Sequence, residues 1–398
     1  MARRVTMTKV DPGGVQPSAA WHRELRTRLV RWYRKHRRDL PWRNTRDPYA
    51  IWVSEIMLQQ TQVATVVPYY LAFLQAFPTV DRLASADEHE VLRRWEGLGY
   101  YRRARQLHAA AQVLVEQHGG TFPQDLAAVR TLPGIGRYTA GAIVSIAFDL
   151  PAPILEANTV RLWSRLVGYA GDVTRAAGQQ ILWRHATDVL PVRGSRELNQ
   201  ALMELGSLIC TPQAPACERC PLKTKCAAYA AGEQDKIPQS KAKVKFENVH
   251  EAAVVVSRGE HVLLRRCAPG ERWAGLWDFL RFAVAARGGQ ALVRELTAKV
   301  RDQTGLKLAG LTRFTTLKHG VTRFRITLDG FLADCPRAPG PLPDESLKWV
   351  RVDQLDKFAL STTGRKLSRL HFNAETSAAA TSPKASPGQG SKKAARRA

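Results

Sequence analysis

The sequence predicts a multi-domain chain, with an all-α domain over residues 21–232 followed by a smaller α+β domain over residues 249–372. Three observations support this fold class. Apolar residues recur at the spacing of amphipathic helices throughout the first region. Alternation of apolar and polar residues, which is typical of strands, begins only in the second region. Between the two, residues 233–248 are polar, Lys-rich and contain proline, as is typical of a linker.

The individual elements follow from local patterns. A basic arm, residues 1–20, is expected to be disordered. The first helix then begins, with Trp21, Leu25, Leu29 and Trp32 forming its buried stripe. In the second domain the expected elements are strands at 252–256, 261–264 and 322–332 and one helix at about 290–303.

The chain is expected to end in a second disordered basic segment, residues 373–398. This segment is rich in Ala, Ser and Pro and closes with pairs of Lys and Arg residues. Such a composition buries too little apolar surface to offset the loss of chain entropy on folding.

The composition indicates a nucleic-acid partner. Sixty Lys and Arg residues against 35 Asp and Glu residues give a net charge of +25, which favours binding to a polyanion. No apolar run approaches the roughly 20 residues that a membrane helix needs, and the start lacks the apolar stretch of a secretory signal. We therefore expect a cytoplasmic, nucleoid-associated protein without membrane contact, whose six cysteines do not form disulfide bonds.

Four cysteines form a compact run with the spacing C-x6-C-x2-C-x5-C: Cys210, Cys217, Cys220 and Cys226. Four thiolates suit either a [4Fe–4S] cluster or zinc. Zinc ribbons usually separate two C-x2-C pairs along the chain, and this run does not, so the spacing favours iron–sulfur. The two remaining cysteines, Cys267 and Cys335, are interpreted as ordinary packed thiols.

Residues 132–140, Leu-Pro-Gly-Ile-Gly-Arg-Tyr-Thr-Ala, join two helical stretches through a tight turn. Gly134 and Gly136 allow the backbone to approach a ligand closely. The helix that follows the turn begins with free N–H groups and the positive end of its dipole. This combination is typical of a phosphate-binding turn.

Together with these two motifs, residues 40–43 (Leu-Pro-Trp-Arg), 54–63 and 97–101 form an ordered set. The chain resembles, over about residues 21–370, the MutY-type adenine DNA glycosylases of the helix-hairpin-helix endonuclease III superfamily. The resemblance implies a helical glycosylase domain with a [4Fe–4S] cluster loop. It also implies a monomer that acts in base excision repair on double-stranded DNA. The implied reaction hydrolyses the N-glycosidic bond of adenine mispaired with 8-oxoguanine or guanine and leaves an abasic site.

The resemblance assigns the general acid to Glu55, which lies in a nearly apolar helical stretch. Burial there raises the pKa of a carboxyl group, so that it can hold and deliver a proton. Relatives with strand-cleaving activity carry a Schiff-base lysine two residues after the second hairpin glycine, and this chain has Tyr138 there. A phenol cannot form an imine. Water is therefore the expected final nucleophile, and the enzyme is expected to be monofunctional.

The second acid departs from the family pattern. Relatives read Asp-Gly-Asn, whereas this chain reads Glu156-Ala157-Asn158. Glu156 keeps the charge that stabilises an oxocarbenium ion but is longer by one methylene group. Since Ala157 also replaces a glycine, the backbone is expected to absorb the extra length. Glu156 is thus retained as catalytic, supported by Asn158 and Tyr138.

The resemblance also implies two further groups of residues. The adenine pocket is expected to contain Arg38, Leu40, Trp42, Arg43, Gln200 and Met203. The expected DNA contacts are Gln60, Tyr100, Gly134, Gly136, Arg137, Lys318 and His319. Within the second set, Gln60 and Tyr100 match residues that wedge into the base stack, which offsets part of the cost of extruding the adenine.

The second domain resembles the Nudix-like domain that ends such proteins, through residues 273–279 and Trp349-Val350. A Nudix hydrolase needs clustered glutamates on a helix to hold magnesium, and the segment after Glu295 lacks them. Recognition of the opposite DNA strand is the expected role. Lys318 stands where relatives read 8-oxoguanine, and an ammonium group cannot accept a hydrogen bond, so the preference between 8-oxoguanine and guanine stays open.

Two alternative functions stay open as well. If Glu156 does not replace the family aspartate, the chain is a catalytically weakened iron–sulfur protein that binds DNA and senses lesions. The other alternative is an endonuclease III-like glycosylase for pyrimidine lesions with lyase activity, and Tyr138 argues against it.

Overall fold

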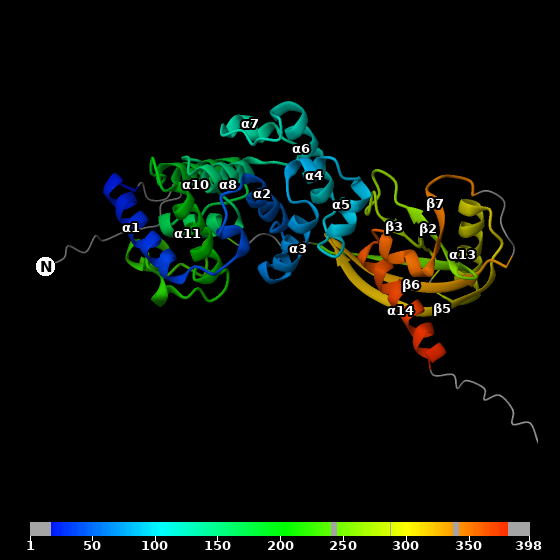
Figure 1. Cartoon of the computed structure of the whole chain (residues 1–398). Coiled ribbons are helices and arrows are strands. Elements are labelled where there is room, and N and C mark those ends of the chain that lie inside the picture. The colour runs from blue at the N-terminus through cyan, green and yellow to red at the C-terminus, as the bar shows by residue number, and fades with distance from the viewer. Residues whose placement is uncertain (1–16, 240–244, 287, 337–341, 381–398) are drawn as a thin grey trace, which may run out of the picture. The chain divides into compact units, whose positions relative to one another are not determined.

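The computed structural model describes residues 17–239, 245–286, 288–336 and 342–380. The chain divides into two compact units, Met1–Lys245 and Phe246–Ala398. The first unit is helical, and the second is built around a mixed sheet (Figure 1). The predicted fold class is confirmed, and the division lies inside the segment expected to be a linker.

The described part of the first unit consists of α-helices joined by short loops and 3-10 turns. The helices are α1 Ala19–His36, α2 Pro48–Met57, α3 Val63–Ala76, α4 Val80–Ala84, α5 Glu88–Trp95, α6 Arg102–His118, α7 Leu126–Thr131, α8 Arg137–Phe148, α9 Ala157–Val167, α10 Ala176–Asp188, α11 Ser195–Leu208 and α12 Ala227–Ala230. The 3-10 turns are η1 Pro41–Arg43, η2 Cys217–Arg219 and η3 Lys223–Lys225.

The first helix starts two residues before the predicted start at residue 21. Ser18 caps α1, because its side chain accepts a hydrogen bond from the backbone N–H of Trp21. The stripe packs as the spacing predicts, with Leu25 and Leu29 fully buried and Trp32 partly buried. Residues 1–16 of the expected arm lie outside the described residues.

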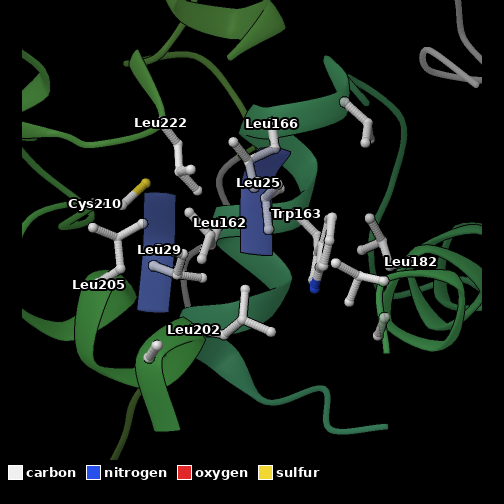
Figure 2. Packing of buried hydrophobic residues seen from close by; sticks show 14 of the residues in the cluster. Leu25, Leu29, Leu162, Trp163, Leu166, Leu182, Leu202, Leu205, Cys210 and Leu222 are labelled. Atoms are coloured by element: carbon white, nitrogen blue, oxygen red, sulfur yellow. The ribbon is translucent and has the colours of Figure 1, made fainter. Parts of the chain in front are cut away.

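Four helices of the first unit meet in one apolar core, shown in Figure 2. Its labelled members come from α1, α9, α10, α11 and the segment that follows α11. They are Leu25, Leu29, Leu162, Trp163, Leu166, Leu182, Leu202, Leu205, Cys210 and Leu222. This packing fixes α9 and α11 against each other, and it anchors the start of the cysteine run at the edge of the core.

Part of the expected linker packs against the helical unit. Ile237 is 3% exposed, and Arg165 Nε donates a hydrogen bond of 2.8 Å to its carbonyl oxygen. The expectation of a free linker over all of 233–248 therefore differs from the structure at both ends. Residues 233–239 belong to the first unit, and strand β1 already begins at Glu247.

The second unit contains a seven-stranded sheet with the order β3-β2-β1-β6-β5, in which β4 also pairs with β1 and β7 with β2. Its elements are β1 Glu247–Arg258, β2 His261–Arg266, β3 Trp277–Asp278, β4 Leu280–Ala283, α13 Gly289–Thr304, β5 Ala309–Val321, β6 Phe324–Asp334, β7 Leu347–Arg351, η4 Val352–Lys357 and α14 Thr362–Ala380. Only β1 and β6 are parallel among the registered pairs of the described strands.

Alternate residues of β1 face two different cores. Val254 packs with Leu296 of α13, whereas Val255 packs with Leu367 of α14. The two helices therefore cover opposite faces of the sheet, as the period of two in a strand requires. Helix α14 continues to Ala380, beyond the expected end of the domain at residue 372, and residues 381–398 of the expected tail lie outside the described residues.

Candidate active site

A pocket of about 490 Å³ in the first unit collects residues from widely separated parts of the chain. Its volume is within the range of small-molecule sites. Every residue that the sequence analysis assigned to catalysis or to the adenine pocket lines it: Arg38, Leu40, Trp42, Arg43, Glu55, Tyr138, Glu156, Asn158, Gln200 and Met203. They are carried by the loop after α1, by η1, and by helices α2, α8, α9 and α11.

Glu55 lies on α2, a helix that is buried along nearly its whole length. Asp47 caps this helix by accepting the backbone N–H of Tyr49 at 2.9 Å. The Glu55 residue is 5% exposed. Burial raises its pKa to about 7, and the nearby charge of Glu156 adds to the rise. A hydrogen bond from Tyr138 and the positive charge of Arg43 oppose it.

Tyr138 is the second residue of α8 and contacts the acid directly. Its hydroxyl donates a hydrogen bond of 2.6 Å to Glu55 Oε2 and lies 3.3 Å from Met203 Sδ. Burial and the neighbouring carboxylates hold the pKa of Tyr138 well above its ordinary value. The phenol therefore stays protonated and acts as a fixed donor to Glu55.

Glu156 caps α9, and this explains how the longer side chain is accommodated. Its carboxylate turns back over the helix and accepts the backbone N–H groups of Asn158 at 2.8 Å and Thr159 at 2.9 Å. Asn158 Nδ2 donates a third hydrogen bond of 3.1 Å. Thr159 Oγ1 in turn accepts the backbone N–H of Glu156, which completes a capping box.

The charge state of Glu156 is set by two opposing effects. Burial raises the pKa of Glu156 above its ordinary value, and the hydrogen bonds from Asn158 and Thr159 offset part of that rise. The positive end of the α9 dipole also favours the ionised form. Arg161 Nη2 donates to Asn158 Oδ1 at 2.9 Å and to the carbonyl of Gly206 at 2.7 Å. The cap is thereby tied to α11, which forms the other wall of the pocket.

Among the charged residues that line the pocket, Glu204 is the one that sequence reasoning did not assign to it. Glu204 is 0% exposed and forms ion pairs of 2.6 Å with both Arg38 and Arg43. Burial opposes its ionisation, but the hydrogen bonds from the two arginines outweigh burial and lower the pKa of Glu204 to about 2. A sequence signal that could have revealed Glu204 is its position four residues after Gln200, which places both side chains on the same face of α11.

The hairpin lies in the same unit, between α7 and α8. Gly134 has φ +74°, and a Cβ atom there would lie 2.7 Å from Cβ of Gln106. Gly136 precedes α8, and no side chain caps this helix, so its first N–H groups stay available to a phosphate. The guanidinium of Arg137 lies 3.8 Å from the ring centroid of Trp183.

The two residues expected to wedge into DNA lie on two turns, and the turn that carries Gln60 lines the pocket. Gln60 follows α2 and Tyr100 precedes α6, and both are exposed. Each has a positive φ, 57° for Gln60 and 50° for Tyr100. Non-glycine residues rarely adopt this conformation, and it occurs mostly where surrounding contacts enforce it.

The four cysteines of the run line a single cavity with Arg165. Arg165 Nη1 donates to Cys210 Sγ at 3.3 Å, and Cys226 Sγ donates to the Arg165 carbonyl at 3.3 Å. Burial raises the pKa of Cys220 to about 12 and that of Cys226 to about 11. Such thiols ionise only when a cation compensates the charge.

The donor set fits a group with thiolate ligands. Within the residues that the structure describes, no three His, Cys, Asp or Glu side chains lie close enough together to hold a single metal ion. All four sulfur-bearing side chains nevertheless border one enclosed space. Four thiolates that border one cavity are the ligand set of a [4Fe–4S] cluster.

The expected DNA contacts of the second unit lie in strand β5. Lys318 is exposed, whereas both ring nitrogens of His319 are buried and have no hydrogen-bond partner within the described residues. Burial lowers the pKa of His319, whose ring centroid lies 6.4 Å from that of Trp273. Successive strand residues point to opposite faces, so the two side chains do not share one surface.

Glu295 on α13 has a structural role. Its carboxylate accepts the backbone N–H groups of Ala285 at 3.2 Å and Ala286 at 3.0 Å. It also pairs with Lys299 at 3.1 Å. These contacts hold the loop after β4 against α13 and use the carboxylate that a magnesium site would need.

Comparison with known proteins agrees with this arrangement. Residues 53–186 match the model of the HhH-GPD superfamily base excision DNA repair proteins, and residues 251–370 match that of the NUDIX domain. Adenine DNA glycosylase of Homo sapiens is 36% identical over 346 residues, which cover 81% of this chain and 63% of the relative. Adenine DNA glycosylase of Mus musculus is 31% identical, with 87% of this chain and 78% of the relative covered.

Among solved structures, a thermostable thymine-DNA glycosylase matches 53% of this chain and 98% of its own length, with 30% identity and a TM-score of 0.49. The sequence relatives cover both units, in the same order along the chain. The family follows from two findings. A helical glycosylase unit precedes a NUDIX unit in the chain, and the identity to the mouse relative is above 30% over most of that protein. This chain belongs to the adenine DNA glycosylases.

Proposed function

We propose that this chain is a monofunctional adenine DNA glycosylase of base excision repair. Its substrate is double-stranded DNA with adenine mispaired with 8-oxoguanine or guanine, and its product is an abasic site. The observation that carries this proposal is the pair of carboxyl groups in one pocket. Glu55 has a pKa of about 7 and is hydrogen-bonded by Tyr138, and Glu156 is held at the start of a helix.

The chemistry follows from these two environments. Glu55 holds a proton near neutral pH, and Tyr138 donates to Oε2, so the carboxyl proton occupies Oε1. Transfer of that proton to the adenine ring makes the base a better leaving group. The C1′–N9 bond then breaks with its electron pair moving to the base. Proton delivery of this kind contributes roughly 10²–10⁴-fold.

Glu156 stabilises the oxocarbenium ion that remains on the sugar. A carboxylate about 4 Å from a unit positive charge gains about 4 kcal/mol at intermediate dielectric, which corresponds to roughly a thousandfold in rate. Water then adds to C1′ and loses a proton to a carboxylate of the pocket. Since Tyr138 replaces the Schiff-base lysine, no imine forms between the protein and the sugar, and the DNA strand stays intact.

We further propose that Cys210, Cys217, Cys220 and Cys226 hold a [4Fe–4S] cluster. When bound, the cluster supplies cross-linking of the irregular segment after α11. Arg165 neutralises part of the charge of the thiolates. Its guanidinium also donates hydrogen bonds to the carbonyls of Thr211 at 2.7 Å and Pro212 at 3.2 Å, which orders the start of the cysteine segment. Purified protein should be brown and contain four iron atoms per chain.

Cys220→Ser should lose both the visible absorbance and the iron. Cys267→Ser is the matched control, because Cys267 is a buried thiol of the second unit. Colourless protein with stoichiometric zinc would contradict the cluster.

The net charge of +25 and the uncapped start of α8 support DNA as the partner, bound by a monomer in the cytoplasm. No helix in the described parts of the chain has the length and hydropathy of a membrane span. For the second unit we propose contact with the strand opposite the adenine. Exposed Lys318 is available for such a contact, whereas the His319 nitrogens are covered by neighbouring side chains.

The decisive experiment uses duplexes with adenine opposite 8-oxoguanine, guanine, thymine or cytosine. Alkali treatment reveals abasic sites, and borohydride traps any Schiff base. The wild type should release adenine opposite 8-oxoguanine or guanine, and Glu55→Gln should bind the same duplexes without releasing it. Absence of release despite tight binding would favour the lesion-sensing alternative. Efficient borohydride trapping would favour the lyase alternative.

A further inference from the structure

A single buried guanidinium joins the turn after α2, which lines the pocket, to the turn before α6. Arg103 is the second residue of α6 and is 9% exposed. Its two terminal nitrogens donate to six oxygen atoms. Nη1 donates to three backbone carbonyls, those of Ile56 at 2.9 Å, Met57 at 2.9 Å and Gln59 at 2.5 Å. Nη2 donates to Thr61 Oγ1 at 3.2 Å and to the carbonyls of Leu98 at 3.4 Å and Gly99 at 3.2 Å.

These oxygens belong to three pieces of the site. Ile56 and Met57 are the last residues of α2, directly after Glu55. Residues 58–62 form the turn after α2, and three of them, Leu58, Thr61 and Gln62, line the pocket. Residues 97–101 form the second turn. The guanidinium therefore links the helix of the acid to both turns.

The two turns carry the exposed residues whose backbone is strained. Gln60 and Tyr100 both have a positive φ, and Tyr100 is 47% exposed. The Arg103 guanidinium lies 5.5 Å from the centroid of the Tyr100 ring and 5.4 Å from that of Trp95. An exposed aromatic ring on a turn that Arg103 ties to the helix of Glu55 suits stacking on a nucleobase.

The chemical character of Arg103 explains why an arginine is needed. Within the described residues it has no ion pair with a carboxylate. Burial lowers its pKa to about 10, so it stays a cation at neutral pH. A planar fork can hold oxygens on two different turns, whereas the point charge of a lysine cannot bridge them. Its position at the C-terminal end of α2 also matches the negative end of the helix dipole.

We infer that Arg103 is the positioning residue that couples base extrusion to base release. It holds the turns of Gln60 and Tyr100 at a fixed distance from α2, so that a base displaced by these residues enters the pocket within reach of Glu55. This inference rests on the proposed function. It assigns to Arg103 no contact with the substrate.

The test uses Arg103→Lys, with Arg102→Lys as the matched control because Arg102 is the exposed neighbour on the same helix. Single-turnover adenine release is measured on adenine opposite guanine and on adenine opposite a stable abasic analogue, where no base pair has to be broken. In the Glu55→Gln background, 2-aminopurine at the adenine position reports extrusion by its fluorescence. Thermal unfolding and affinity for undamaged duplex check the fold.

Arg103→Lys should slow release from the paired substrate by roughly 10²-fold, the cost of a misplacement of about 1 Å. It should slow release from the unpaired substrate by less than about threefold and abolish the fluorescence rise. Arg102→Lys should change none of these. Equal losses on both substrates, or an unchanged paired rate, would overturn the inference while leaving the proposed function intact. Absence of release by the wild type would instead refute the proposed function.

Discussion

The hydrogen bond between Tyr138 and Glu55 makes a quantitative prediction about pH dependence. The tyrosine hydroxyl donates to Glu55 Oε2 at 2.6 Å and stabilises the ionised carboxylate. Tyr138→Phe removes this donor and leaves a more apolar surrounding. Both changes favour the protonated acid, so the pKa of Glu55 should rise above about 7.

The size of the shift follows from the strength of the bond. A hydrogen bond to a charged group contributes about 1.5–3 kcal/mol, and one pKa unit corresponds to about 1.4 kcal/mol. The pKa of Glu55 should therefore rise by roughly one to two units. Since base release needs the protonated acid, its rate falls about tenfold per pH unit above this pKa. The variant should keep its maximal rate to a higher pH than the wild type.

The assay is single-turnover adenine release between pH 5.5 and 9.5. Met203→Leu is the control, because it removes the sulfur near the tyrosine hydroxyl and keeps the hydrogen bond to Glu55. Its descending limb should coincide with that of the wild type. A descending limb of Tyr138→Phe at the same or a lower pH would refute the reasoning, whatever the height of its plateau.

Three other predictions follow. Glu55→Gln should stabilise the folded protein by about 3 kcal/mol above pH 7 and should have no effect on stability below about pH 4.5. The reason is that folding raises the pKa of Glu55 from 4.5 to about 7, so that the wild type is destabilised only where the buried carboxyl group has to ionise. Equal unfolding temperatures of the wild type and the variant at pH 8 would contradict this. Glu156→Asp should lower single-turnover release by about 10- to 100-fold, because the capping contacts fit the longer side chain, and a faster variant would indicate a poorly fitted glutamate. Gly134→Ala should weaken binding to undamaged duplex about fivefold, since a Cβ atom there would lie 2.7 Å from Cβ of Gln106 and displace the turn that presents the first N–H groups of α8, at a cost of roughly 1 kcal/mol in phosphate contact. Gly119→Ala, with φ +57° and open space around it, is the control that should leave affinity unchanged.

Much of the site could be predicted because its residues lie in short motifs. The stretches around Leu40 and Glu55, the hairpin and the cysteine run each carry local chemistry that a spacing or a residue type reveals. Glu204 was missed because its role depends on two arginines more than 160 positions earlier in the chain. Arg103 was missed for the same reason: its partners are backbone oxygens, which leave no residue pattern in the sequence.

The boundaries of the segments also needed the structure. A Lys-rich, Pro-containing segment is typical of a linker, yet Ile237 is buried and held by Arg165. Composition describes how polar a segment is on average. Whether the segment packs against a domain depends instead on whether a single apolar side chain fits an apolar site on that domain. In the same way, His319 lies on a strand face covered by Trp273 and its neighbours, and no local pattern predicted that cover.

The sequence by itself determined the two domain types and the four-cysteine run, because each depends on residue identity and short-range spacing, and its resemblance to a family predicted the acid Glu55 and Tyr138 in place of a lysine. Only the tertiary structure decided how Glu156 is accommodated, which charge neutralises the pocket arginines and what holds the two turns in place. These depend on distances between side chains and backbone atoms far apart in the chain. Such distances are set by the packing of the helices against one another, which one-dimensional order does not specify.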